Sequence, residues 1–235
     1  MDIEARIEGL DWDRITREID QRGWATTGPI LTDDERRALV SGYDRDEQFR
    51  STVVMARHGF GQGEYRYFAY PLPPLVHRLR QGLYERLVPL ANRWRSALGA
   101  GDSFPGKFED YILSCHAAGQ ARPTPLILRY RPGDYNCLHQ DLYGEHVFPL
   151  QVAVLLSAPG TDFTGGEFVL TEQRPRMQSR ATVVPLGRGD AAVFAVNARP
   201  VKGSRGDYRV TMRHGVSEVR TGQRRVLGLI FHDAA

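Results

Sequence analysis

The sequence predicts a mainly β fold with N-terminal helices (α+β), in which the strands form a double-stranded β-helix, or jelly roll. From Gly106 onward, short runs of β-branched and apolar residues alternate with glycine and proline turns, which is typical of a sandwich or barrel. Before that point, apolar residues recur at helical spacing. We therefore expect residues 1–105 to form a helical extension and residues 106–235 to form the β-helix core, within one integrated domain.

The N-terminal part begins with a predicted helix over residues 2–20, followed by a strand at residues 24–30. Thr32 stands three residues before Glu35 in a capping-box arrangement, which predicts that a helix begins there and covers residues 33–43. Another helix is expected over residues 74–98. Its predicted buried stripe consists of Leu75, Leu79, Leu83, Leu87 and Leu90.

Residues 58–74 are rich in glycine, proline and tyrosine, and we expect an irregular loop there. The strands expected after it are PLILRY, FPLQVAVLLS, GGEFVLTEQ, ATVVPL, DAAVFAV, RVTMRHGVSEV and RRVLGLIFH.

Composition limits the function classes. The 235 residues are 41% hydrophobic, enough for one sizeable core. No apolar run approaches the roughly 18 residues of a membrane span, and the N-terminus is acidic and polar, so we expect a soluble, cytoplasmic protein without a membrane partner. The two cysteines, Cys115 and Cys137, do not indicate a disulfide framework.

The net charge of +3 permits an anionic partner without requiring one. Lys107 and Lys202 are the only lysines, so nearly all of the positive charge is arginine, which suits phosphate or carboxylate recognition. A compositional bias of the source genome explains this equally well.

Three residues form a candidate metal site. His139 and Asp141 are two positions apart, so in a strand their side chains share a face, and His214 lies in another predicted strand. Two histidines and one carboxylate on one side of an ion form the facial triad of non-heme iron oxygenases. Cys137 is a weaker ligand candidate, and its alternative is a small packed residue.

Arg224 follows His214 by ten residues, at the start of a predicted strand. A cation there can form a bidentate salt bridge to the far carboxylate of 2-oxoglutarate. Arg225 should face the opposite side of the strand, although a bulge would exchange the two roles.

The stretch RYRPGDYNCLHQD, from Arg129 to Asp141, resembles a motif of the alkylated-DNA demethylases within the Fe(II)/2-oxoglutarate dioxygenase superfamily, and HGV at 214–216 is similar too. TGGEF at 164–168 and VPLGRGDAAVF at 184–194 are closer to the prolyl-hydroxylase-like branch. The chain as a whole resembles a bacterial family described as oxygenases acting on damaged DNA.

This resemblance implies Fe(II), 2-oxoglutarate and O₂ as cofactor and co-substrates. It implies that His139, Asp141 and His214 are catalytic iron ligands, that Arg224 anchors the distal carboxylate, and that Tyr130 donates a hydrogen bond to the co-substrate. Packing of the barrel is the other role open to Tyr130.

Two positions depart from the demethylase pattern. An asparagine and a second arginine of that family are replaced by Leu128 and Ile230. The metal and co-substrate residues are unaffected, but the substrate is left open.

Three functions therefore remain: oxidative demethylation of alkylated DNA or RNA with release of succinate, CO₂ and formaldehyde; hydroxylation of a peptide or small molecule; and a non-catalytic jelly-roll binding module. We expect residues 61–73 to form a substrate lid, with Tyr65, Arg66 and Tyr67 as contact residues. Packing of this aromatic segment onto the jelly roll is the alternative.

Overall fold

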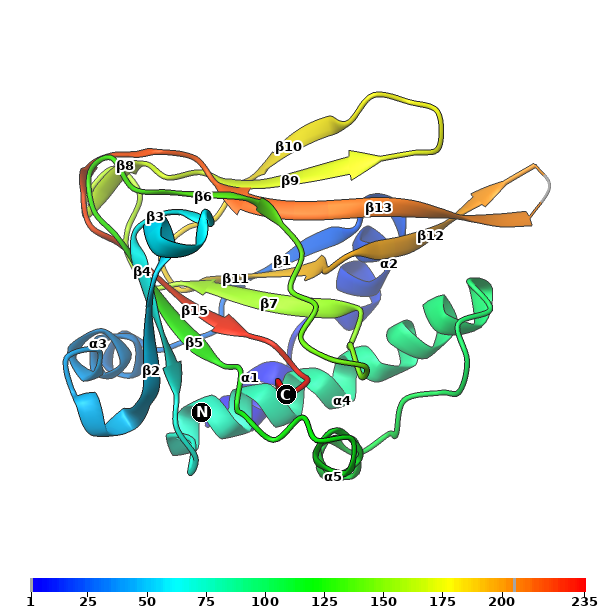
Figure 1. Cartoon of the computed structure of the whole chain (residues 1–235), viewed down its shortest axis with the longest axis horizontal. Helices are drawn as coiled ribbons and strands as arrows, with labels where there is room; N and C mark the ends of the chain where they lie inside the picture. Colours follow the sequence, from blue (N-terminus) through cyan, green and yellow to red (C-terminus); the bar gives the residue numbers. More distant parts are fainter. Residues whose placement is uncertain (1, 205) are drawn as a thin grey trace.

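A computed structural model describes residues 2–204 and 206–235 of the chain. Two antiparallel sheets face each other, and helices cover the outer side of the larger one (Figure 1). This is the jelly-roll arrangement that the sequence predicts.

The larger sheet has the strand order β1-β11-β7-β15-β5-β4-β2. Its strands are β1 (Trp24–Pro29), β2 (Phe49–Val54), β4 (Glu64–Phe68), β5 (Leu126–Tyr130), β7 (Leu150–Leu155), β11 (Asp190–Ala195) and β15 (Arg224–Leu229). The smaller sheet has the order β10-β9-β13-β6-β3, with β12 paired to β13. Its strands are β3 (Gly61–Gln62), β6 (Tyr135–His139), β9 (Phe168–Gln173), β10 (Arg180–Val184), β12 (Ala198–Gly203) and β13 (Gly206–Val216). A separate pair joins β8 (Phe163–Gly165) to β14 (Val219–Gly222).

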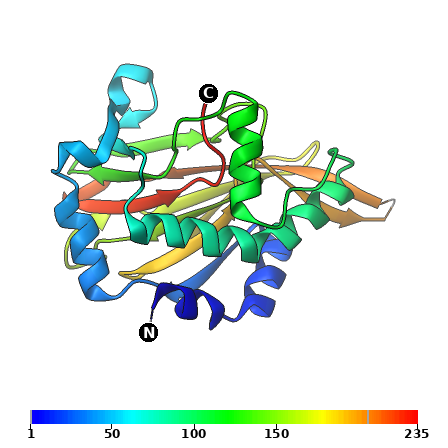
Figure 2. The same ribbon diagram turned by 90° about the horizontal axis from the view of Figure 1, so that it is seen from below.

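The helices pack against the larger sheet, and the long helix α4 crosses beneath it (Figure 2). They are α1 (Ile3–Glu8), α2 (Trp12–Arg22), α3 (Asp33–Gly42), α4 (Pro74–Ala97) and α5 (Phe108–Ala117), with the short 3₁₀ turns η1 (Asp46–Gln48) and η2 (Met55–His58). The capping box of Thr32 and Glu35 is confirmed at the start of α3. Of the predicted stripe on α4, every leucine is buried except Leu75, which is half-buried. No helix among residues 2–204 and 206–235 is long and apolar enough to cross a membrane.

Alternation along the strands divides the core into two. On β7, Val152 and Val154 face the helices, whereas Gln151 and Ala153 point between the sheets. On β15, Leu227 faces the helices. The space between the sheets is therefore lined by every second residue of β5, β7 and β15, and this is where the candidate site lies.

Several predicted elements are wrong in detail. The expected helix over residues 2–20 is two helices, because Gly9 ends α1 and Asp11 caps α2. The irregular loop predicted over residues 58–74 contains β4, which is paired on both sides, with β2 and β5. Helix α5 was not predicted, since the texture after Gly106 indicated strands, and strand β12 was not predicted either.

Candidate metal and co-substrate site

The two sheets contribute opposite walls of a cavity of about 180 Å³. Strands β6 and β13 of the smaller sheet present His139 and His214, which are directly paired across the ladder. Asp141 follows β6 in the chain. These are the three residues that the spacing of the sequence selected, and the structure brings them together.

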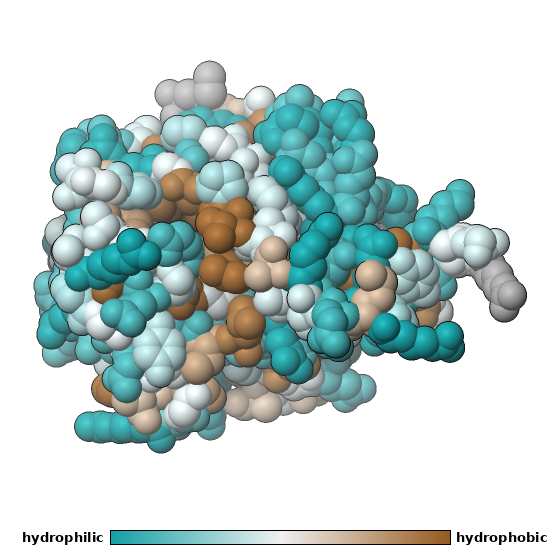
Figure 3. Space-filling view, turned by 90° about the horizontal axis from the view of Figure 1, so that it is seen from above, coloured by the Kyte–Doolittle hydropathy of each residue, from teal (hydrophilic) through white to brown (hydrophobic). Residues whose placement is uncertain are grey.

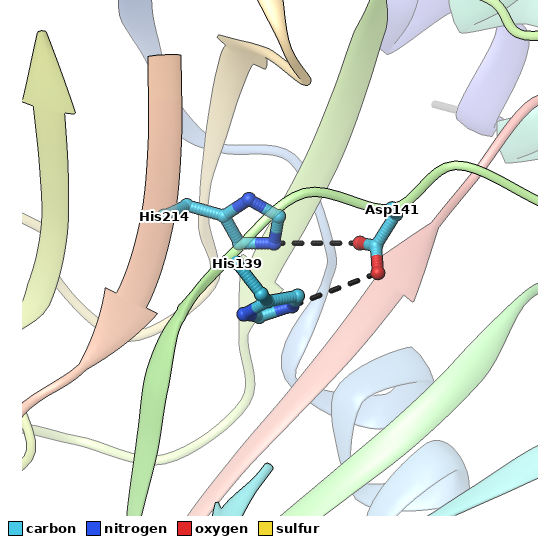
Figure 4. A group of neighbouring side chains, drawn as sticks. All are labelled: His139, Asp141 and His214. Carbon is cyan, nitrogen blue, oxygen red and sulfur yellow. Dashed lines mark ion pairs between the residues drawn. The ribbon is translucent and has the colours of Figure 1, made fainter. Parts of the chain in front are cut away.

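The three side chains point toward one another (Figure 4). Nε2 of His139 lies 3.6 Å from Oδ1 of Asp141, and Nε2 of His214 lies 3.3 Å from Oδ2. One ligand atom from each residue lies within 4.8 Å of the others, which is the geometry of a group that could hold a metal ion. The donor set of two imidazoles and one carboxylate suits Fe(II) with open coordination positions.

A bulge in β6 explains how His139 reaches the cavity. His214 pairs with His139 and Val216 pairs with Asn136, so three steps along β6 match two along β13. The extra residue turns both Asn136 and His139 toward the cavity. Strand alternation would place Cys137 on the same face as His139, two residues away. Because of the bulge, Cys137 is exposed rather than packed, and it lies outside the cluster of potential metal ligands.

The protonation states favour metal binding. Burial, together with the neighbouring charge of His214, lowers the pKa of His139, so its ring is neutral near pH 7. Its Nδ1 lies 2.8 Å from the carbonyl oxygen of Cys137, which leaves Nε2 for an ion. Although burial opposes it, the hydrogen bond and charge of His214 hold the pKa of Asp141 well below its usual range.

Arg224 enters the same cavity from the larger sheet. Its side chain is 2% exposed, and within the described residues Nε and Nη1 have no hydrogen-bond partner. Burial lowers its pKa to about 10, so it stays charged at neutral pH. A buried guanidinium with free donors fits a bound carboxylate, which is an observation in favour of 2-oxoglutarate.

Tyr130 is paired with Arg224 across β5 and β15, and the guanidinium carbon lies 5.5 Å from its ring centroid. Burial raises the pKa of Tyr130 to about 12, so the phenol keeps its proton. Arg225 faces the other side, where it donates to the Val40 carbonyl oxygen at 2.7 Å. No bulge exchanges Arg224 and Arg225.

The predicted lid residues are separated by the alternation of β4. Tyr65 lines the cavity. Tyr67 is buried, and Arg66 lies on the opposite face, where it pairs with Asp46 at 2.6 Å and donates to the Tyr43 carbonyl oxygen. The structure therefore brings Tyr65, but not Arg66, to the cavity.

Other cavity residues were missed from the sequence. Gln151 and Tyr143 both donate to Asp141, at 2.8 and 2.7 Å. Gln151 had a signal, because it is an amide within the otherwise apolar strand LQVAVL. Tyr143 had none. Leu128 lines the cavity and Ile230 is buried beside Tyr67, so both departures from the demethylase pattern occupy apolar surroundings.

Solved structures of three other proteins have folds similar to that of this chain. A prolyl-4-hydroxylase from Pseudomonas putida matches with a TM-score of 0.57 at 14% identity, over 95% of this chain and 100% of that one. A 2OG-Fe(II) oxygenase from Burkholderia pseudomallei matches with a TM-score of 0.54 at 15% identity, over 97% and 94% of the two chains. A viral collagen prolyl hydroxylase from Paramecium bursaria Chlorella virus-1, solved with 2OG, matches with a TM-score of 0.52 at 16% identity, over 89% and 95%.

Fold, triad and family together define the protein as an oxygenase of the 2-oxoglutarate and Fe(II) class, with Fe(II), 2-oxoglutarate and O₂ as cofactor and co-substrates. Residues 63–234 match the family described as "Oxygenase, catalysing oxidative methylation of damaged DNA", and the chain belongs to that family. An uncharacterized protein of Mycobacterium tuberculosis is 53% identical over 168 residues, which cover 72% of each chain. Membership of this oxygenase family argues against the third function considered from the sequence, a non-catalytic jelly-roll binding module.

Proposed function

We propose that this oxygenase demethylates alkylated nucleic acid oxidatively, in a DNA-repair role, with His139, Asp141 and His214 as its iron ligands. The observation that carries the proposal is the cavity itself. Apart from the three proposed ligands and Arg224, its lining among the described residues consists of apolar, aromatic and neutral polar side chains. A neutral, planar base suits such walls, and the family description names damaged DNA.

The residues that line the cavity would bind the co-substrate and exclude water. Bound Fe(II), together with 2-oxoglutarate and O₂, supplies the oxidation of a substrate C–H bond, with succinate and CO₂ as co-products. Arg224 binds the distal carboxylate of 2-oxoglutarate, and Tyr130 donates a hydrogen bond beside it. Leu128 and Val226, which line the same cavity, exclude water from these groups. An N-methyl group that is hydroxylated here would be lost as formaldehyde.

The rim of the site is suited to a large substrate. Figure 3 shows apolar side chains on the outer surface of the molecule, on the side of the smaller sheet. Phe60, which lines the cavity, is 47% exposed and its ring stacks on His58 with centroids 5.3 Å apart. An exposed aromatic ring at the entrance offers a stacking surface for a base. Tyr65 is the second candidate contact for the substrate.

The test supplies purified protein with Fe(II), 2-oxoglutarate and single-stranded DNA carrying N-methyl lesions. We expect formaldehyde to appear in step with succinate, and the same oligonucleotide without methyl groups to give neither above background. If no N-methyl lesion stimulates turnover, nucleic-acid demethylation is ruled out for this site.

Hydroxylation of a peptide is the second candidate, because the structural neighbours include prolyl hydroxylases and the TGGEF segment resembles that branch. A proline-containing peptide that stimulates succinate formation without formaldehyde would select it over demethylation.

A further inference from the structure

Arg224 lines a second cavity besides the one that contains the potential metal ligands. This second cavity has a volume of about 340 Å³ and is formed by β8, the loop before β8 and the end of β10. We call it the outer cavity, and we call the cavity of His139, Asp141 and His214 the metal cavity. Arg224 and Phe168 line both cavities, so the two adjoin at these side chains.

The guanidinium of Arg224 lies between the two cavities. Its carbon is 5.5 Å from the ring centroid of Tyr130, which lines the metal cavity, and 5.9 Å from that of Phe163, which lines the outer cavity. Within the described part of the chain, Nε and Nη1 have no hydrogen-bond partner that ties the group to either side. A cation at this position can attract a carboxylate from either cavity.

The outer cavity opens to solvent. Its lining includes exposed residues of β8 and β10, Thr164 and Val183, and the second of these is 57% exposed. The same lining includes the buried side chains of Phe163 and Arg224. The outer cavity therefore leads from solvent to the guanidinium, and Phe60, at the rim of the metal cavity, does not line it.

Glycines form the wall of the outer cavity beside Arg224. Gly165 and Gly166, from the TGGEF segment, both line it. Gly166 has a φ of +61°, and an added Cβ would lie 2.9 Å from Cδ of Arg224. No side chain of residue 166 therefore stands between the stem of Arg224 and the outer cavity.

The charges of the outer cavity favour passage of an anion over storage. Apart from Arg224, Glu167 is the one charged residue in its lining among the residues that the structure describes. A hydrogen bond from the Ser217 hydroxyl holds the pKa of Glu167 below its usual range, so Glu167 is negative at neutral pH. This carboxylate repels an anion that stays in the outer cavity, whereas Arg224 attracts it further in.

We propose that the outer cavity is a second entrance, through which the dicarboxylates 2-oxoglutarate and succinate reach and leave Arg224. A molecule that enters with its 2-oxo acid end first leaves its other carboxylate at Arg224, which is the orientation that binding requires. The substrate then has the rim at Phe60 to itself. This inference rests on the proposed role of Arg224 in binding the distal carboxylate, and goes beyond it by assigning the route.

The test measures how fast 2-oxoglutarate binds to and leaves the Co(II)-loaded protein, by the change in visible absorption of the ion after rapid mixing. Leu186 is half-buried and lines the outer cavity, so Leu186→Trp places a larger side chain in the path. Both rate constants should fall by the same factor, on the order of tenfold. The Kd should stay unchanged, because a group on the route alters the barrier and not the end states.

Leu75→Trp is the matched control, since Leu75 is also half-buried but lies on α4 and lines neither cavity. Its two rate constants should match those of wild type. Thermal melts identify any variant that fails to fold.

Glu167→Gln tests the route without added bulk, and replaces Leu186→Trp if that variant fails to fold. Loss of the repulsion should raise the association rate of 2-oxoglutarate by roughly two- to tenfold at low ionic strength, and salt should reduce the difference. Glu218→Gln removes an exposed carboxylate that does not line the outer cavity, and should have a smaller effect.

Arg224→Met separates the two levels of the inference. If Arg224→Met binds 2-oxoglutarate as tightly as wild type, the proposed role of Arg224 fails. If Arg224→Met weakens binding but Leu186→Trp leaves both rate constants unchanged, or alters the Kd without slowing association, the route is overturned while the role of Arg224 stands. Equal effects of Glu167→Gln and Glu218→Gln would also overturn the route.

Discussion

Asp141 and Arg224 are both buried charges in one cavity, but their surroundings differ. Asp141 has donors on both oxygens and two histidines within 4 Å, whereas Arg224 has two nitrogen atoms without partners in the described residues. We call the part of the cavity around Asp141 the metal end and the part around Arg224 the co-substrate end. At the metal end, the carboxylate of Asp141 is held in one orientation before any ligand binds. The co-substrate end carries an uncompensated charge that a carboxylate would satisfy, at a cost to the stability of the free protein.

The largest expected effect is at the metal end. Asp141→Ala removes the one carboxylate that both histidines face, and should abolish succinate formation from 2-oxoglutarate. The measurement is succinate released per enzyme with saturating Fe(II). Retained turnover would mean that the ion is held elsewhere.

Arg224→Met should have opposite effects on binding and stability. Losing two charge-assisted hydrogen bonds should weaken 2-oxoglutarate binding by on the order of 100-fold or more. Removing an unpaired buried charge should raise the unfolding free energy of the ligand-free protein by about 1–4 kcal/mol. Calorimetric titration and denaturant unfolding check the two effects.

Arg225→Met is the control for this pair of effects, because Arg225 faces away from the cavity and donates to Val40 and Gln223. Its 2-oxoglutarate affinity should match wild type. A stability loss in Arg224→Met would contradict the description of Arg224 as an uncompensated charge.

Gly166→Ala should have a smaller effect at the same end. Gly166 has a φ of +61°, and an added Cβ would lie 2.9 Å from Cδ of Arg224. We expect the KM for 2-oxoglutarate to rise severalfold, because the guanidinium must shift, with a smaller change in kcat. Steady-state kinetics separate the two constants, and an unchanged KM would show that Arg224 has room to move.

The smallest expected effect is a shift in pH dependence at the metal end. Burial lowers the pKa of His139, so protons compete with the ion only below the ordinary histidine range. The ring of His139 in the metal-free protein should therefore titrate below pH 6.5, which an NMR titration of its ring protons measures. A midpoint at 6.5 would contradict the effect of burial on His139.

The sequence predicted the residues of the site better than their surroundings. His139 and Asp141 were selected by a two-residue spacing, and His214 and Arg224 by a distant strand, a ten-residue spacing and the family resemblance; the structure brings all four to one cavity. The β6 bulge broke strand alternation for Cys137, because an inserted residue leaves no signature in a run as short as YNCLH. Tyr143 and Tyr67 meet only through tertiary packing, and β4 was hidden by glycines and prolines on either side of EYRYF.

The placement of the two cavity ends on different sheets has a consequence for dynamics. His139 and His214 belong to the smaller sheet and Arg224 to the larger one. A ligand held at both ends would cross-link the sheets, so opening of either would require its release. Amide hydrogen exchange should then slow together in β6, β13 and β15 when metal and 2-oxoglutarate are both present, and less when only one of them is added.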